Sequence, residues 1–232
     1  MGAIDFLSQS AMAEPRADSE ILAQKLTLGE TISAALAVDG HDPSAAYPSK
    51  PSPAIDVQSI PLDKETTWEY MKDFLDLCAV TPCLDREAFS HQYANVVTNC
   101  RQNNGDIPPL HRFNVNMGIA IGVFMSNSSR LEPWAAALHS SSTDLLPTIL
   151  RYGRPLESLY CLYLLIIYSL FSPSGGSAWH IVGLAIRLCI TMGLHKQASA
   201  HAGLTAHEVN ERRWLFWSIY ILDRSVIRLL LR

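Results

Sequence analysis

The segment from Glu211 to Arg224 constrains the fold of this chain more than any other, because it joins charged and large aromatic residues in one stretch with helical periodicity. At 3.6 residues per turn, one broad apolar face collects Leu215, Phe216, Ile219, Leu222, Val226, Ile227 and Leu230. Asp223 falls within this apolar face. An unpaired buried carboxylate costs several kcal/mol, so Asp223 needs a cation or several hydrogen-bond donors. The segment therefore predicts a helix that packs on the rest of the domain and supplies Asp223 with a partner.

Three arginines are the candidate partners of Asp223. Arg187 is the charged residue within the preceding helical segment, and Arg212 and Arg213 come from a neighbouring turn of the same segment. We expect one of them to form a buried ion pair, in which case Asp223→Asn lowers the free energy of unfolding by about 3 kcal/mol. Arg213 and Trp217 are four residues apart, so a cation–π contact between them is also expected.

An alternative is a nucleic-acid surface, because such surfaces place cations beside aromatic rings. The residues that suggest it are Arg212, Arg213, Arg224, Arg228 and Arg232, interleaved with Trp214 and Trp217. The charge balance argues against it. The chain has 18 basic and 22 acidic residues and a net charge of −4, whereas proteins that bind phosphate backbones usually carry a basic surplus. We therefore favour a structural role for these residues, and any DNA contact must be local or come from another module.

Three ordered motifs give the chain a resemblance to a known family. Residues 212–224 read Arg-Arg-Trp-Leu-Phe-Trp, then five residues, then Asp-Arg; residues 178–195 form an apolar segment that closes in Gly-Leu-His. Residues 82–89 are similar to a short turn and helix that follow the family's first domain helix. Together the motifs resemble the regulatory domain, or middle homology region, of fungal zinc-cluster transcription factors. The residues taken as its structural signature are Arg187, Arg212, Arg213, Phe216, Trp217, Asp223 and Arg224.

The resemblance implies a transcription regulator, and not an enzyme, that acts in the nucleus through protein contacts. The expected partners are the transcription machinery or a full-length homologue, with a small-molecule effector as a further possibility. Four aromatic residues, Tyr160, Tyr163, Trp179 and Trp214, could line an apolar ligand cavity, although such residues are more often ordinary core. The alternative is a helical ligand-binding module or an enzyme of a metabolic gene cluster. No nucleophile elbow, phosphate loop or paired acids at catalytic spacing support the enzyme.

The chain departs from the family pattern in its cysteines. Family members usually carry a six-cysteine cluster that holds two zinc ions and contacts DNA. The five cysteines here, Cys78, Cys83, Cys100, Cys161 and Cys189, include no Cys-x-x-Cys pair. A zinc site built from Cys78, Cys83, His91 and Cys100 matches no common ligand spacing. We therefore expect no metal or other cofactor in this chain, and DNA binding only through a missing module.

Hydrophobicity indicates a folded core and no membrane span. Hydrophobic residues make up 48% of the 232-residue chain, enough for one globular domain. The longest apolar run, residues 159–171, is shorter than the roughly 20 residues that span a bilayer, so a core helix is expected there. Cys161 and Cys189 stand alone among apolar residues, which is typical of small core side chains.

The chain divides into two parts. Residues 1–61 are polar and Ala-rich and then Pro-rich, which predicts a disordered lead-in with one short helical pattern at residues 20–38. Residues 62–232 form the regulatory domain. The family typically continues past the last residue of this chain, so we expect a C-terminal truncation. No run of alternating strand residues occurs, and the fold class is therefore all-α, an irregular antiparallel helical array with a disordered N-terminal tail.

Local signals place the helices of the domain. Thr66 and Glu69 have the spacing of a capping box and predict the first helix, and Asp85 predicts the cap of the second. Residues 115–125 form a third helix, in which Gly118 and Gly122 permit close approach of a neighbour. A fourth helix starts near Pro133 and runs toward residue 150.

A helical hairpin and a last helix follow. Residues 156–171 and 177–194 form two apolar helices that a short turn forces antiparallel. Gly193 fits a left-handed cap at the end of the second. Thr205 and Glu208 predict a capping box before the last helix.

Overall fold

The computed structural model describes residues 64–102, 107–126, 129–172, 175–196 and 203–230, and these residues are helical with connecting turns and no strand. The helices in chain order are α3 (Lys64–Val80), α4 (Arg86–Gln102), α5 (Pro109–Met125), the short 3₁₀ helix η2 (Ser129–Leu131), α6 (Glu132–Thr143), α7 (Leu146–Tyr152), α8 (Pro155–Phe171), α9 (Ala178–Thr191) and α10 (Ala206–Leu230). The all-α prediction is confirmed in this part of the chain. The domain boundary at residue 61 and the helical pattern at residues 20–38 lie outside the described residues.

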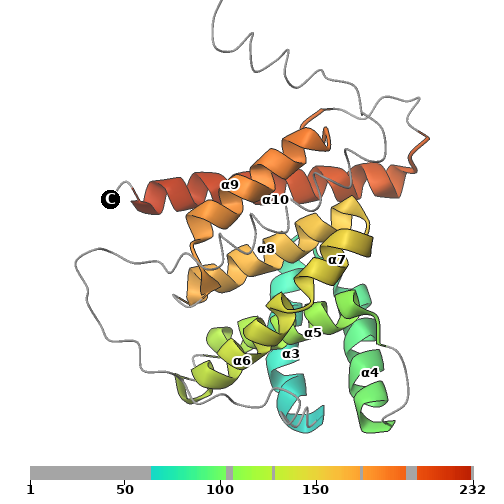
Figure 1. Ribbon diagram of the computed structural model, residues 1–232, viewed down its shortest axis with the longest axis vertical. Helices are drawn as coiled ribbons and strands as arrows, with labels where there is room; N and C mark the ends of the chain where they lie inside the picture. Colours follow the sequence, from blue (N-terminus) through green and yellow to red (C-terminus); the bar gives the residue numbers. More distant parts are fainter. Residues whose placement is uncertain (1–63, 103–106, 127–128, 173–174, 197–202, 231–232) are drawn as a thin grey trace, which may run out of the picture.

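The helices are arranged in layers (Figure 1). Helices α9 and α10 lie together on one side, α8 runs through the middle, and α3, α4, α5 and α6 form the other side. Helix α5 is the hub of that second group, since it packs on α3, α4, α6 and α8. One continuous apolar core therefore joins the two sides through α5 and α8.

The start of α3 differs from the prediction, whereas the start of α4 agrees with it. Lys64 is already helical, so Thr66 and Glu69 lie inside the helix and do not cap it. The neighbouring Thr67 is buried, and its hydroxyl shares a 2.8 Å hydrogen bond with the hydroxyl of Tyr93 on α4. Asp85 caps α4 as predicted, because its Oδ1 accepts hydrogen bonds from the second and third backbone N–H groups of the helix at 2.9 and 3.1 Å.

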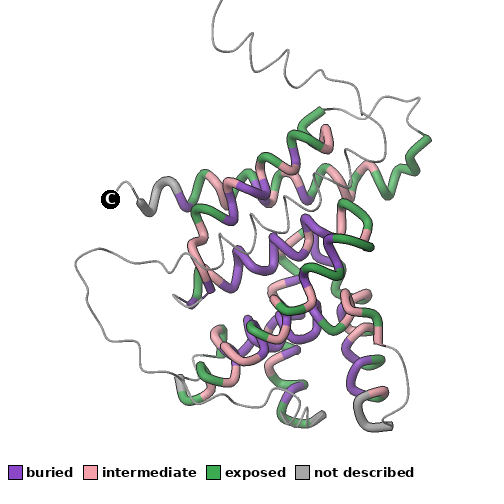
Figure 2. Tube along the Cα trace, viewed as in Figure 1, coloured by how far each residue is buried: buried purple, intermediate pink, exposed green. Residues whose placement is uncertain are grey.

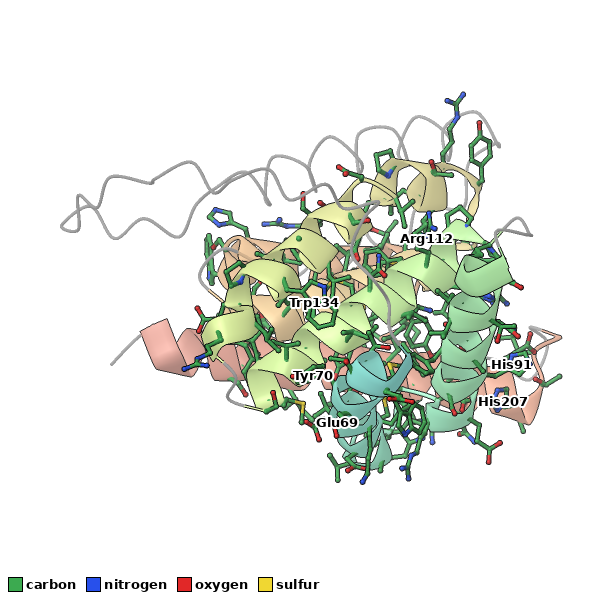
Figure 3. All side chains as sticks on the ribbon, turned by 90° about the horizontal axis from the view of Figure 1, so that it is seen from below. Glu69, Tyr70, His91, Arg112, Trp134 and His207 are labelled. Carbon is green, nitrogen blue, oxygen red and sulfur yellow. The ribbon has the colours of Figure 1, made fainter. Side chains whose placement is uncertain are left out.

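Helix α5 approaches α3 closely through its glycines, as predicted. A methyl group at Gly122 would lie 2.7 Å from the carbonyl carbon of Tyr70, and one at Gly118 would lie 2.9 Å from the ring of Phe74. The helix begins at Pro109, six residues before the predicted start, because proline fits the first turn of a helix. Tyr70 of α3 also meets Trp134 of α6 edge to face, with ring centroids 6.0 Å apart (Figure 3).

The predicted fourth helix is two helices. Pro133 lies in the first turn of α6 as expected, but α6 ends at Thr143 and α7 starts at Leu146. Pro147 explains the break, since it has no N–H to donate to the carbonyl of Thr143 and its ring would clash with that carbonyl.

Helices α8 and α9 form the predicted antiparallel hairpin (Figure 1). Helix α8 is buried from Ser158 to Tyr168, apart from the partly buried Tyr160, and this middle part is largely purple in Figure 2. The expectation of a core helix is confirmed there, whereas Leu170 and Phe171 at its end are exposed. Gly193 ends α9 with a φ of +67°, and the next N–H, of Leu194, returns to the carbonyl of Cys189 at 2.9 Å. The left-handed cap is therefore also as predicted.

A histidine lies in the apolar core beside α8. The ring of His139 on α6 stacks on that of Tyr168 on α8, with centroids 4.3 Å apart and planes 7° from parallel. Among the described residues, no group accepts from or donates to the Nε2 atom of His139. Burial lowers the pKa of His139 from 6.5 to about 4, because an imidazolium there would lose its hydration.

We predict that Gly122→Ala lowers the free energy of unfolding by about 3 kcal/mol, because the new methyl group meets the backbone of α3, which cannot move aside as a side chain can. The matched control is Gly183→Ala on α9, where the nearest atom is 4.0 Å away. There the substitution should stabilise the protein by about 0.5–1 kcal/mol through helix propensity. Urea unfolding of both variants tests the prediction, and equal stabilities would contradict it.

The pKa of His139 predicts an acid-sensitive core. Between pH 6.5 and about 4 the unfolded chain binds a proton at this histidine and the folded chain does not, so stability falls as the pH drops through this window. The loss amounts to about 3 kcal/mol. His139→Phe should keep the ring stack and remove this part of the pH dependence, whereas His91→Phe on the exposed side of α4 should retain it, because His139 is still present. Unfolding curves at pH 7, 5.5 and 4 provide the measurement, and parallel slopes for His139→Phe and the wild type would refute it.

Candidate functional site

Helix α10 carries most of the signature residues, and its inner face is held in the core. Its first turn is closed by the predicted capping box: the N–H of Thr205 donates to Glu208 Oε2 at 2.7 Å, and the N–H of Glu208 donates to Thr205 Oγ1 at 3.2 Å. Leu215, Ile219 and Val226 are buried, and Phe216 and Leu222 are packed against the core. The predicted apolar face is confirmed for these five residues, while the side chains of Ile227 and Leu230 lie outside the described part.

Arg212 joins α10 to the end of α9. Its guanidinium donates a 3.1 Å hydrogen bond to the backbone carbonyl of Met192, the residue that follows the last turn of α9. The last carbonyls of a helix have no partner within it and carry partial negative charge, so a cation is favoured there. The first arginine of the signature therefore caps α9 and draws α10 against it.

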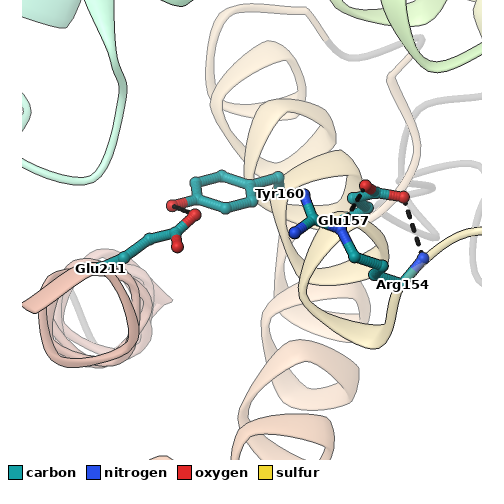
Figure 4. Close-up of polar contacts among 4 residues, drawn as sticks. All are labelled: Arg154, Glu157, Tyr160 and Glu211. Carbon is teal, nitrogen blue, oxygen red and sulfur yellow. Dashed lines mark hydrogen bonds and ion pairs between the residues drawn. The ribbon is translucent and has the colours of Figure 1, made fainter. Parts of the chain in front are cut away.

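Tyr160 and Glu211 join α10 to α8. The hydroxyl of Tyr160 donates to Glu211 Oε1 at 3.1 Å across the gap between the two helices (Figure 4). Burial, followed by the negative charge of Glu211, raises the pKa of Tyr160 well above 10, so the phenol stays protonated as a donor. Glu157 closes the start of α8 by accepting from the N–H of Arg154 at 2.9 Å, which Figure 4 also shows.

A second polar cluster lies one turn further along α8 and two turns further along α10. The hydroxyls of Tyr163 on α8 and Ser218 on α10 lie close to the thiol of Cys83, which follows α3. Burial raises the pKa of the Cys83 thiol, and this thiol is therefore protonated and inert. The contact connects α10 to the α3–α4 turn as well as to the hairpin.

The predicted partners of Asp223 are wrong. Its carboxylate pairs with its neighbour in the chain, Arg224, whose Nε lies 3.0 Å from Oδ2. The side chain of Asp223 is 15% exposed and that of Arg224 54% exposed, so the pair lies at the edge of the buried face. Arg187 is exposed on α9, and Arg212 is engaged by Met192. The long guanidinium of the adjacent residue reaches back over the apolar edge, which makes a partner from another helix unnecessary.

The expected cation–π contact is also at another position. The guanidinium of Arg224 lies 5.3 Å from the ring centre of Tyr220, and Arg213 is exposed to solvent. Among the described residues the pairing of Arg213 with Trp217 does not occur. Trp217 packs instead on its aromatic neighbours Phe216 and Tyr220, at 5.5 and 5.6 Å between ring centroids.

The four aromatics proposed for a ligand cavity are divided between surface and interior. Trp179 and Trp214 are about half exposed, whereas Tyr163 is buried and Tyr160 is partly buried in the contact between α8 and α10. A ligand cavity shared by these four residues stays a prediction.

The solvent side of α10 is an aromatic and basic surface. The apolar members are Trp214, Trp217, Tyr220 and Ile221, exposed by 47, 48, 38 and 60%. Arg213 and Arg224 are exposed on the same side. We call these six residues the outer face of α10. No exposed carboxylate lies among them, because Asp223 is largely buried and paired. Tryptophan, tyrosine and arginine are the residues enriched at binding hot spots.

The remaining titratable groups do not form a metal centre in the residues that the structure describes. No three His, Cys, Asp or Glu side chains of this part come together in a way that could hold a metal ion. Burial raises the pKa of the thiols of Cys78 and Cys189 to about 12 and also raises that of Cys161, and the core position predicted for Cys161 and Cys189 is confirmed.

Comparison with known proteins identifies the family. The family described as "Fungal specific transcription factor domain" matches residues 67–228, from the first turns of α3 almost to the end of α10. The chain belongs to this family. The resemblance drawn from the three motifs is thereby confirmed, and α10, with the arginine anchor and the outer face, lies within the matched region.

Several curated relatives are fungal regulators. The chain is 31% identical over 156 residues to the "Negative regulator of pleiotropic drug resistance STB5" of Candida glabrata, covering 62% of this chain and 16% of that protein. It is 31% identical over 152 residues to "Protein STB5" of Saccharomyces cerevisiae, covering 62% of this chain and 20% of that protein. It is also 31% identical over 85 residues to the "Pyrimidine pathway regulatory protein 1" of Saccharomyces cerevisiae, covering 37% of this chain and 9% of that protein. The chain thus spans a fifth or less of these relatives' lengths.

Two further findings concern solved structures and membrane spans. No solved structure matches the chain. In the described part, none of the helices has the length and apolar character needed to cross a bilayer.

The anchors of α10 were missed by sequence reasoning. Tyr160 and Glu211 are 51 residues apart, and nothing in the local pattern of either indicates the other. Arg212 carried a signal, since a cation in the first part of one helix can cap the helix before it when the two are antiparallel. Because Arg212 and Arg213 are adjacent, the sequence alone did not indicate which of the two arginines faces inward.

We predict that the two signature arginines differ in their effect on stability. Arg212→Ala should lower the free energy of unfolding by about 1.5 kcal/mol, because the carbonyl of Met192 loses a charged donor. Arg213→Ala, at an exposed position in the same dipeptide, should change it by less than about 0.5 kcal/mol. Thermal or urea unfolding of the two variants distinguishes them, and a larger loss for Arg213→Ala would reverse the assignment.

The observed pairing also revises the expected effect of Asp223→Asn. Because its partner Arg224 is more than half exposed and solvent screens the pair, the loss of stability should be about 1 kcal/mol and not 3. Asp223→Asn and Arg224→Gln should show similar losses, and the double variant should lose less than their sum. A loss near 3 kcal/mol for Asp223→Asn alone would indicate a buried partner after all.

Proposed function

We propose that this domain is the regulatory part of a fungal transcription regulator and acts in the nucleus by binding protein partners through the outer face of α10. Membership of the fungal-specific transcription factor family supports the class of function. The curated relatives, whose names describe regulators, support it further. We propose regulation and not catalysis, and partners drawn from the transcription machinery or from a longer homologue.

The observation that carries the proposal is the contrast between the two sides of α10. The inner side is anchored by Leu215, Ile219, Arg212 and Glu211, so the helix is a rigid part of the domain. The outer side presents two half-exposed tryptophans and two arginines on this rigid support. A surface with large rigid aromatics and no carboxylate is suited to protein contacts, because such side chains bury much area at little entropic cost.

DNA contact is proposed to come from a module outside this sequence. The 232 residues contain no Cys-x-x-Cys pair that could hold the family's zinc cluster, and the relatives are several times longer than the matched region. We therefore assign no metal or other cofactor to this domain. A small-molecule effector is part of the proposal as an additional partner.

The proposal can be tested in a yeast reporter strain in which the complete 232-residue chain is fused to an unrelated DNA-binding module and activator. The double variant Trp214→Ser, Trp217→Ser should change reporter output by about tenfold, the effect of losing roughly 1.4 kcal/mol of partner binding. Loss of the two side chains from the solvent side should leave the core intact, which circular dichroism checks.

The matched control is Tyr152→Ser on α7, an aromatic residue that is 75% exposed. Its reporter output should equal that of the parent fusion at equal protein level. If the outer-face variant and the Tyr152 variant gave the same output, the proposed contact surface would be wrong.

A further inference from the structure

The outer face of α10 has a composition that selects the charge of its partner. Its exposed charges are both positive, Arg213 and Arg224. Arg224 is paired with Asp223, which leaves Arg213 as the cation of this face without an acidic partner on its own helix. The other acids of α10 are engaged elsewhere, Glu211 by Tyr160 and Glu208 by the capping box. A second copy of the same face would therefore bring arginine against arginine. Like charges brought together at an interface are unfavourable, so the surface fits an acidic partner and not itself.

The N-terminal part of the chain carries the charge opposite to that of the outer face. Residues 1–63 contain nine acidic and three basic residues, a net charge of −6, whereas residues 64–232 contain thirteen acidic and fifteen basic residues, a net charge of +2. The basic surplus is concentrated in residues 212–232, which contain five arginines and one acid. The chain thus carries an acidic N-terminal part and an arginine-rich C-terminal end, although helix α10 as a whole, with four arginines and three acids, has a net charge of only +1.

One stretch of the acidic part also has the apolar pattern that the outer face requires. In residues 18–39, Ile21, Leu28, Ile32 and Leu36 fall on one side at 3.6 residues per turn, and four acids accompany a single lysine. Gly29 interrupts this pattern, and a helix of this length is marginal on its own in water. Such a segment gains stability from an apolar surface against which it can form.

The connection is long enough for intramolecular contact. Twenty-four residues, 40–63, separate the segment from the first described residue, Lys64, and an extended chain of this length spans about 75 Å. Helix α10, with 25 residues, is about 38 Å long. A tethered segment has an effective concentration in the millimolar range, so even a weak contact is populated.

We propose that residues 18–39 of the same chain bind the outer face of α10, with their apolar side on Trp214, Trp217 and Ile221 and their carboxylates toward Arg213 and Arg224. The contact is autoinhibitory, because an external partner that uses the outer face must displace the segment. This inference rests on the proposed function of the outer face. It names residues 18–39 as the segment that covers this face before an external partner binds.

The test uses the full chain with a photo-crosslinking benzophenone residue in place of Ile221, which leaves both tryptophans unchanged. Irradiation should join position 221 to peptides from residues 18–39, identified by mass spectrometry. An equal mixture of ¹⁵N-labelled and unlabelled chains should give products within one chain only. The same residue placed at Tyr152 on α7 is the control and should not give this product.

Charge reversal checks the specificity of the contact. Glu20→Lys with Glu30→Lys should reduce the crosslinking yield by about tenfold, and adding Arg213→Glu should restore a substantial part of it. Arg213 is exposed, so its replacement should leave the melting temperature unchanged.

Three results would overturn the inference: absence of products with residues 18–39, products that join two chains, or a yield insensitive to the Glu20 and Glu30 reversals. If crosslinking fails while the reporter still depends on Trp214 and Trp217, the segment is not the occupant and the proposed function stands. If the reporter output is also unchanged by the Trp214 and Trp217 substitutions, both the autoinhibitory contact and the proposed function of the outer face are wrong.

Discussion

Helix α8 is the constraint on which the rest of the domain depends. Nearly every side chain from Ser158 to Tyr168 is buried, so the helix is apolar on all sides and must be covered on all sides. Each buried leucine or isoleucine contributes about 1.5–3 kcal/mol, and their sum exceeds any polar contact in the domain. Helices α5, α7, α9 and α10 provide the cover. The close approach of α3 to α5 at Gly122 then sets the width of the layer beneath.

Helix α10 completes this cover and also forms the functional surface. Its inner residues Leu215 and Ile219 are fully buried, and Arg212 and Glu211 attach it to α9 and α8. Because the helix is fixed on one side, its exposed tryptophans are presented on a rigid support. The signature of the family therefore serves two purposes in one helix: one set of residues anchors it, and the other presents a rigid aromatic surface.

The proposed contact between α10 and the N-terminal segment depends on complementary charge more than on complementary shape. An arginine-rich face near one end of the chain and an acidic segment near the other form a pair that attracts within one molecule. In a regulator, such a contact lets partner binding and segment release compete for one surface. The competition links the two proposals without requiring a change in the helical core.

The features that sequence reasoning predicted correctly are those determined locally. The cap at Asp85, the left-handed turn at Gly193 and the capping box at Thr205 each depend on residues within a few positions of one another. The glycine pair on α5 was also recognised, since small residues one turn apart leave room for a neighbouring backbone. Amphipathic periodicity was enough to identify the inner face of α10.

The errors arose where interactions between distant residues, or competing local interactions, determine the structure. The break between α6 and α7 follows from Pro147, which periodicity alone did not reveal. Asp223 was assigned a partner from the preceding helix or from a neighbouring turn because its position is apolar, but the adjacent Arg224 reaches it with less loss of side-chain freedom. The contact of Tyr160 with Glu211 depends on the packing of α8 on α10, and so no local pattern contains it.

The central claim is that α10 is an integral part of the core around α8, and native-state hydrogen exchange tests it most directly. The backbone amides of residues 211–222 should exchange with the same free energy of opening as those of α8, because uncovering one exposes the other. Arg212→Ala should lower both equally. Rapid exchange throughout α10 beside full protection of α8 would contradict the claim and would show that the family's signature helix is only loosely attached to the domain.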